Sequence, residues 1–241
     1  MLTGRKEPRH ETICSMTRTP TPQAEFWQGD FGNCYIDRNL SPPEQLQARR
    51  MMWAAILSHT LSAPPQTILE VGANIGNNLR SLRSLTSARF LALEPNDKAR
   101  QRLIDDGVLK AEDVRGGLAA EIDFPDGAAD LVFTSGVLIH IHPDQLEVSI
   151  REIHRCAARW IATIEYFSDK PEMIPYRGHN DRLFKRDFGG FWLDTFPELR
   201  VTAYGFAWKR VTGLDNLTWW LFEKPRLAQR TRSSPLKVDD T

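Results

Sequence analysis

One stretch decides the fold of this chain: Thr67-Ile68-Leu69-Glu70-Val71-Gly72-Ala73-Asn74-Ile75-Gly76-Asn77-Asn78. Its first residues are mostly apolar, as expected of a strand that is buried on both faces of a parallel sheet. Gly72 and Gly76 allow the backbone to turn sharply and to pass close to a ligand. Apolar residues then recur at helical spacing up to Leu85, so the stretch predicts a strand, a tight turn and a helix. A helix that begins there points its free N–H groups at whatever lies above the strand.

Two ligand classes suit such a turn: a dinucleotide and S-adenosylmethionine (SAM). A dinucleotide loop needs glycine at its first, third and sixth places, so that the pyrophosphate can approach the backbone. Here those places hold Gly72, Asn74 and Asn77, of which one is glycine. The pattern Glu70-x-Gly72-x-Asn74-x-Gly76 instead resembles the first motif of the class I SAM-dependent methyltransferases. That resemblance implies that Glu70 orients the amino-acid end of SAM, and that Gly72, Asn74 and Gly76 form the cofactor turn.

The composition limits what else the chain can be. Its 241 residues are enough for one α/β domain with additions, and 41% of them are hydrophobic, which can fill a core. The formal net charge is zero, so we expect no nucleic-acid partner. The three cysteines lack metal spacing, and we see neither a signal peptide nor a long apolar run. We therefore expect a cytoplasmic protein without a metal site or a membrane span, either a monomer or a homodimer.

The residues after the first motif predict further strands that end near the same ligand. Residues 89–93 form the second expected strand, and the carboxylate of Glu94 at its tip can accept both hydroxyl protons of a ribose. Residues 124–133 contain a Pro-Asp turn and a fourth strand, which again resembles class I methyltransferases. In that family the residues before the turn lie beside adenine, which implies Ala119, Ala120 or Glu121 here.

The remaining patterns complete the expected sheet. A fifth strand is predicted over residues 160–166, and residues 201–209 and 217–222 predict an antiparallel hairpin at the sheet edge. A short third strand is expected to end near residues 116–118. We predict an α/β, Rossmann-like class I methyltransferase fold, with a mostly parallel seven-stranded sheet, helices on both faces and a C-terminal antiparallel hairpin.

Candidate catalytic groups follow the fourth and fifth strands, because ligands bind at the carboxyl ends of strands in open parallel sheets. Ser135 ends the fourth strand and is assigned to the cofactor side. His140 is the first candidate for a general base, and Glu165 is the second, if the acceptor must lose a proton. His140 stands between Ile139 and Ile141, so a structural role for this histidine is equally consistent with the sequence.

Two segments rich in aromatic and charged residues predict the acceptor side of the site. Residues 25–39 contain four aromatics and show neither a helical nor a strand period, so we interpret them as a loop that either packs on the core or closes over the site as a lid. Residues 171–187 are a charged insertion whose arginines and lysine either bind a phosphate or carboxylate of the acceptor or form a plain surface loop. The expected acceptor pocket contains Trp27, Asp30, Tyr35, Tyr176, Arg177 and His179.

Three segments together resemble the pseudaminic acid biosynthesis-associated methylases. They are FWQGDFGNCYIDRN (residues 26–39), SGVLIHI (135–141), and YRGH followed by LFKRDF (within 176–188). The resemblance runs from about Phe26 to Lys224. It implies methyl transfer to a sugar or sugar nucleotide linked to nonulosonic acid or surface-glycan biosynthesis. Three alternatives stay open: methylation of another small molecule or a peptide amine, SAM binding without catalysis, and an NAD-linked oxidoreductase.

The organisation expected from these patterns is one domain between two tails. Residues 1–24 and 225–241 are polar, poor in large apolar groups, and expected to be flexible. Residues 25–224 form the SAM-dependent methyltransferase domain. Within it, residues 25–62 supply the lid and a helix from about Pro42 to Leu61, with Ser41 at its N-cap.

Overall fold

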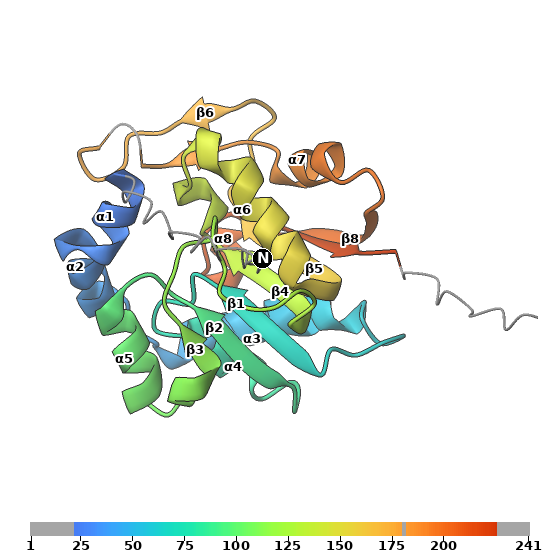
Figure 1. The fold of residues 1–241 in the computed structure, drawn as a ribbon, viewed down its shortest axis with the longest axis horizontal. Helices are drawn as coiled ribbons and strands as arrows, with labels where there is room; N and C mark the ends of the chain where they lie inside the picture. Colours follow the sequence, from blue (N-terminus) through green and yellow to red (C-terminus); the bar gives the residue numbers. More distant parts are fainter. Residues whose placement is uncertain (1–21, 180–181, 226–241) are drawn as a thin grey trace, which may run out of the picture.

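A seven-stranded sheet forms the centre of the structure, a computed structural model that describes residues 22–179 and 182–225 (Figure 1). The strands lie in the order β3-β2-β1-β4-β5-β9-β8. They are β1 (Thr67–Val71), β2 (Arg89–Leu93), β3 (Val114–Arg115), β4 (Ala129–Ser135), β5 (Ala157–Glu165), β8 (Arg200–Ala207) and β9 (Leu217–Glu223). The first five in this order pair in parallel, while β9 is antiparallel to both β5 and β8. The predicted fold class, including its C-terminal hairpin, is confirmed.

Helices cover both faces of the sheet (Figure 1). They are α3 (Pro43–Ser58), α4 (Asn77–Leu82), α5 (Asp97–Asp105), α6 (Pro143–Cys156), α7 (Phe188–Thr195) and the short α8 (Lys209–Thr212), with single 3-10 turns at η1 (Ala111–Asp113) and η2 (Leu138–His140). Successive strand residues point to opposite faces, so each strand feeds two cores. Ile68 joins the core beneath α3, α4 and α5, whereas Leu69 joins the core beneath α6 and α7.

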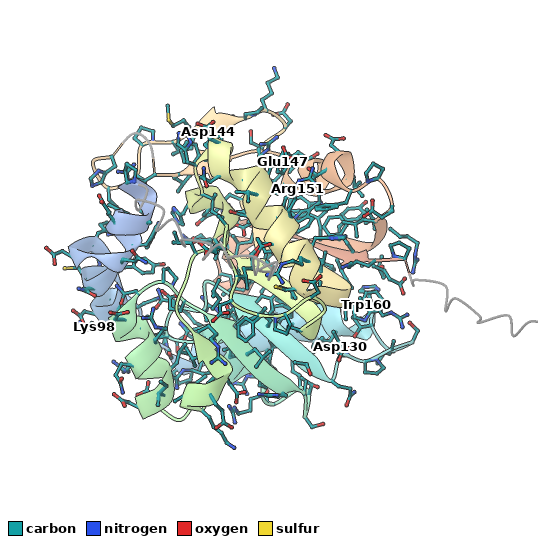
Figure 2. All side chains as sticks on the ribbon, in the orientation of Figure 1. Lys98, Asp130, Asp144, Glu147, Arg151 and Trp160 are labelled. Atoms are coloured by element: carbon teal, nitrogen blue, oxygen red, sulfur yellow. The ribbon has the colours of Figure 1, made fainter. Side chains whose placement is uncertain are left out.

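The amino ends of the central strands are fastened by one carboxylate. Asp130, labelled in Figure 2, accepts hydrogen bonds from the backbone N–H groups of Gln66 and Thr67 at 2.8 and 3.0 Å. This holds β1 in register with β4, so that Val71 lies opposite Thr134 at the other end of the pair. The carboxyl ends of both strands therefore meet at one edge, where the site lies.

Residues 22–38 correct the prediction of an irregular loop. They form two helices, α1 (Pro22–Gln28) and α2 (Asp30–Arg38), which lie beside α5 at one end of the sheet (Figure 1). The rings of Phe26 and Phe31 stack at a centroid distance of 3.9 Å, and Phe31 also packs near Tyr35. Phe31 and Tyr35 are four residues apart on one face of α2, and Trp27 of α1, four residues before Phe31, packs against both rings. That spacing is the signal the prediction overlooked.

Some expected boundaries also differ. The N-cap of α3 is Pro42, so the prediction of Ser41 was wrong; the Ser41 hydroxyl instead donates to Asn77 Oδ1 at 2.5 Å. The third strand is β3, which ends one residue before the predicted place. The inserted segment after β5 contains a two-stranded hairpin, β6 (Glu172–Met173) with β7 (Phe184–Lys185).

The predicted tails lie outside the described residues, except for residues 22–24, which begin α1, and Pro225. Among the described residues, no helix has the length and apolarity that a membrane span requires.

Candidate active site

One cavity at the carboxyl ends of β1, β2 and β4 collects most of the predicted cofactor residues. Glu70, Gly72, Asn74, Glu94, Ala119 and Ser135 all line it. Gly76 is not among its lining residues. A Cβ at Gly76 would meet Leu103 of α5 at 2.6 Å, so this glycine makes room for the neighbouring helix. The predicted cofactor set is thus brought together with one exception.

The turn after β1 has a backbone that its residue types explain. Gly72 and Asn74 have φ values of +78° and +48°, in the left-handed region. Asparagine tolerates that region better than most residues, because its short polar side chain bonds locally. Here Asn74 Oδ1 accepts from the N–H of Ile75 at 2.7 Å. Asparagine can therefore stand where the methyltransferase motif usually has glycine.

Glu94 lies at the tip of β2 with one oxygen on each side of the turn. It is buried, and it accepts from the backbone N–H groups of Asn74 at 2.7 Å and Asn96 at 2.9 Å. Burial raises its pKa to about 7, against the opposing effect of these two hydrogen bonds. A carboxylate offers about four acceptor positions. Two positions on Glu94 thus stay available on a residue that faces the cavity.

Glu70 carries an unpaired oxygen in the same cavity. Its Oε1 accepts from Asn78 Nδ2 at 2.8 Å, whereas its buried Oε2 has no hydrogen-bond partner among the described residues. Burial raises the pKa of this carboxyl to about 8, and the Asn78 bond and the charge of Arg49 oppose that rise. A buried polar atom without a partner is costly, so it is suited to a ligand that supplies one.

Arg49 is a site residue that the sequence reasoning missed. It lies in the middle of α3, where an arginine is typical of a solvent-facing position, yet its side chain lines the cavity. Its positive charge lies within electrostatic range of Glu70 and Tyr35. The cavity therefore holds a carboxyl group and a guanidinium within electrostatic range of each other, which suits the ammonium and carboxylate of an amino acid.

His140 faces the cavity with a defined tautomer. Its Nδ1 lies 2.7 Å from the backbone oxygen of Arg182, and because a carbonyl only accepts, Nδ1 must carry the proton. Nε2 is then left with a free lone pair. Burial lowers the pKa of the imidazole to about 4, although the bond to Arg182 opposes this, so the ring is neutral at pH 7.

Glu165, the second predicted base, lies elsewhere. It is fully buried, does not line the cavity, and accepts from the backbone N–H groups of Val137 and Leu138 at 3.2 and 3.1 Å. The fifth strand thereby holds the segment that leads to His140. Glu165 therefore positions this segment, and its catalytic role stays a prediction that the cavity lining does not support.

The predicted acceptor residues gather around His140, with one exception. Trp27 and Tyr35 line the cavity. Tyr176 and His179 do not line it, but they pack on the same aromatic cluster: Tyr176 lies 5.2 Å from the His140 ring, and His179 lies 5.0 Å from Phe26. We call α1, α2 and the turn 176–179 the lid.

Two charged residues of the predicted acceptor set behave differently from each other. The turn of the lid holds Arg177 at φ +48°, with its guanidinium 5.6 Å from the Tyr176 ring. This places a cation at the aromatic cluster. Asp30 is exposed at the start of α2, outside the cavity lining. Within the described residues, no group of three or more His, Cys, Asp or Glu side chains could hold a metal ion.

Residues 69–159 match the methyltransferase domain family. This region is therefore similar to methyltransferase domains. This region runs from β1 into β5 and carries the turn, Glu94 and His140. The unpaired Glu70 oxygen and the glycine turn fit the cofactor of this class.

Solved methyltransferases have the same fold as this chain. The 1,6-didemethyltoxoflavin-N1-methyltransferase of Burkholderia thailandensis, crystallised with S-adenosylhomocysteine (SAH), is 17% identical with a TM-score of 0.64, over 88% of this chain and 93% of that one. The magnesium protoporphyrin IX methyltransferase ChlM of Synechocystis PCC 6803, also with SAH, is 11% identical with a TM-score of 0.57, over 84% and 98%. The mitomycin 7-O-methyltransferase MmcR is 16% identical with a TM-score of 0.60, over 85% and 61%. No curated protein sequence matches the chain.

The raised pKa of the Glu70 carboxyl leads us to expect that a proton is released when the cofactor binds. Because its pKa is about 8, it is mostly protonated at pH 7, and a bound ligand ammonium would stabilise the carboxylate. Binding should therefore expel a proton, and SAH affinity should rise by up to about tenfold per pH unit between pH 6 and 7.5. Calorimetry in buffers of different ionisation enthalpy measures this release, which Glu70→Gln should reduce. Buffer-independent heats for the unmodified protein would contradict the assignment.

Asn96 attaches the lid to the segment between β2 and α5, and its contacts allow a test of this attachment. Its Nδ2 donates to the backbone oxygen of Trp27 and to Asn33 Oδ1, both at 3.0 Å, while its Oδ1 caps α5 at the N–H of Ala99. Asn96→Asp keeps the cap but replaces the donor with an acceptor, at a cost of about 1–3 kcal/mol to lid docking. Hydrogen exchange should rise in residues 22–38 and stay low in α5.

A matched control for this variant is available nearby. Lys98, labelled in Figure 2 where α5 meets α2, forms an exposed ion pair with Asp37 at 2.5 Å. Exposed pairs contribute about 0.2–1 kcal/mol, so Lys98→Ala should change lid exchange far less than Asn96→Asp. Equal exchange in both variants would show that Asn96 does not hold the lid.

Proposed function

We propose that this protein transfers the methyl group of SAM to a hydroxyl group of a small-molecule acceptor, with His140 as the general base. The main support for this proposal is the contact between Nδ1 of His140 and the Arg182 carbonyl. It leaves Nε2 unprotonated, on a residue that lines the cavity. SAM supplies an activated methyl group on a sulfonium. The protein must align the two centres and exclude water, which can contribute several kcal/mol.

The proton balance explains why a base is needed. As the acceptor oxygen bonds to the methyl carbon, the bond from that carbon to sulfur breaks and its electron pair stays on sulfur. The hydroxyl proton passes to Nε2 of His140 and then to solvent. A neutral imidazole can accept it, and burial keeps His140 neutral at pH 7.

The remaining roles in the cofactor site follow from charge and geometry. The free oxygen of Glu70 would take the ammonium of SAM, and Arg49 its carboxylate. Glu94 would accept from the ribose hydroxyls through its open positions. Ala119 and Ser135 line the same cavity, and we assign Ala119 to the adenine side.

For the acceptor, we propose a sugar or sugar nucleotide linked to nonulosonic acid or surface-glycan metabolism. The resemblance of the lid segments to pseudaminic acid biosynthesis-associated methylases supports this class. The lid also has suitable chemistry: Trp27 and Tyr35 offer aromatic faces in the cavity, and Arg177 offers a cation for a carboxylate or phosphate. The buried Nε1 of Trp27 has no partner within the described residues and can donate to an acceptor oxygen. A cytoplasmic location and a monomer or homodimer stay predictions.

Methyl-labelled SAM tests this function directly. The purified protein is incubated with sugar acids, sugar nucleotides and a peptide amine as separate acceptors, and the products are weighed by mass spectrometry. We expect a methyl mass gain in a sugar-containing acceptor. Transfer to the amine alone would overturn the acceptor class, and SAH binding without transfer to any acceptor would indicate a SAM-binding protein without catalysis.

A further inference from the structure

A second hollow lies at the outer edge of the sheet, next to the carboxyl end of β5. It is an open groove of about 640 Å³, walled mainly by Tyr166, Phe167, Lys185, Tyr204, Phe206 and Lys209. These residues come from the end of β5, from β7, from the edge strand β8 and from α8. Neither the methyltransferase match over residues 69–159 nor the predicted acceptor set includes this groove.

Aromatic rings in this groove are exposed to an unusual degree. Phe167, Tyr204 and Phe206 keep 50%, 73% and 59% of their surface accessible. Tyr204 and Phe206 are two residues apart on one strand, so they project from the same face. Exposed aromatic clusters of this kind mark binding surfaces more often than plain surface. Their flat faces suit a planar or sugar ring.

The charges in the groove favour an anion. Asp215 is already satisfied, because it accepts from the hydroxyl of Tyr166 at 2.7 Å and pairs with Lys209 at 3.0 Å. Lys185 makes no ion pair with any described residue, and its Nζ lies 5.3 Å from the Tyr166 ring. An ammonium group beside exposed rings can bind a carboxylate or phosphate that is attached to a ring.

The groove also adjoins the cofactor cavity. In the backbone pairing, Phe206 of β8 lies opposite Thr218 of β9, and Thr218 lies opposite Glu165 of β5. The groove is therefore level with the carboxyl end of β5, the end at which the cofactor cavity lies. Asp215 lies within electrostatic range of Tyr35 and Arg49, both of which line the cofactor cavity. Both hollows therefore lie at the carboxyl ends of the strands, as an extended molecule that occupies both would require.

We propose that this groove binds the distal end of the methyl acceptor, a ring that carries a carboxylate or a phosphate. The ring lies on Tyr204 and Phe206, its anion pairs with Lys185, and the hydroxyl to be methylated extends toward His140. The inference rests on the proposed function. It adds that the acceptor is an extended anion, and it makes the outer groove a determinant of specificity.

Binding of two probes to the full chain saturated with SAH tests the groove without turnover. Glucuronate carries a ring carboxylate and uridine 5′-monophosphate carries a phosphate, so the two separate the sources of the anion. Saturation-transfer NMR should detect at least one of them. Lys185→Ala and Phe206→Ala should each weaken its binding by roughly tenfold, the effect of losing one charged or stacking contact. Lys170→Ala, an exposed lysine outside the groove lining, should stay within about twofold of the unmodified protein.

Three outcomes decide the matter. If neither probe binds while SAH still binds, the proposal that the groove is a ligand site is wrong. A concentration-dependent dimer that Tyr204→Glu dissociates, with no probe binding, would overturn it by showing that a second copy covers β8. Probe binding that depends on Lys185 and Phe206, in a protein that transfers no methyl group, would support the ligand site and contradict the proposed function instead.

Discussion

His140→Ala should lower kcat by about 10²–10⁴-fold, the usual contribution of a positioned general base. SAH affinity should stay within about twofold, because the cofactor contacts that we assign come from Glu70, Arg49 and Glu94. The expectation follows from one geometric fact: Nδ1 of His140 is occupied by the Arg182 carbonyl, so the proton-accepting nitrogen is the one left over. Steady-state kinetics with the methylated acceptor and calorimetry with SAH measure the two effects.

The lowered pKa of His140 also predicts the pH profile of the reaction. Burial holds the pKa of His140 at about 4, so the base is already deprotonated at pH 6, where an ordinary histidine would be mostly charged. Titration of His140 should therefore not lower kcat as the pH decreases from 7.5 to 6. His59→Ala removes an exposed histidine and serves as the control. A normal kcat for His140→Ala, or an equal loss of SAH affinity, would rule out the base assignment.

Local patterns were sufficient to predict the central sheet and the strand ends that meet at the cavity. Apolar runs at β1, β2, β4 and β5 are bounded by turn residues, so each of these strands can be recognised from its own local pattern. Asn96 illustrates this: an asparagine directly before a helical segment is a typical N-cap, and Asn96 caps α5 by accepting from the N–H of Ala99. Glu94 follows directly, since the end of a parallel strand fixes which edge its carboxylate meets.

The lid could not be predicted in the same way. Helices as short as α1 and α2 are marginal on their own and depend on tertiary packing. Their partners are His140, Tyr176 and His179, which lie more than a hundred residues away in the sequence. A local pattern contains no information about such distant rings, and the glycine between the two helices further obscures the four-residue aromatic spacing.

Glu165 shows a second limit. Glu94 and Glu165 both lie at the end of a buried strand and accept backbone N–H groups, two at Glu94 and three at Glu165. Only Glu94 faces the cavity, and one of the amides that bind it, that of Asn74, belongs to the cofactor turn. Those of Glu165 belong to the segment after β4. Which loop folds over a strand end is decided by tertiary contacts, so the sequence could not separate the two acids.

Gly72→Val should weaken SAH binding by at least about 100-fold. A β-branched residue is a true outlier at φ +78°, and such strain costs on the order of 1–3 kcal/mol. The new Cβ would also lie 2.5 Å from a methyl carbon of Val137. This contact directs the new side chain against the segment that Glu165 holds. Either the cofactor turn or the approach to His140 must therefore move.

Gly107→Val separates strain from displacement. Gly107 also has a left-handed backbone, at φ +64°, but a Cβ there would meet nothing within 4 Å. This variant should lose stability to a similar degree and still bind SAH within about threefold, because only strain is added. Thermal unfolding confirms that both variants fold, and calorimetry gives their SAH affinities. If Gly72→Val folded and bound SAH as tightly as Gly107→Val, the turn after β1 could not be the surface on which the cofactor rests.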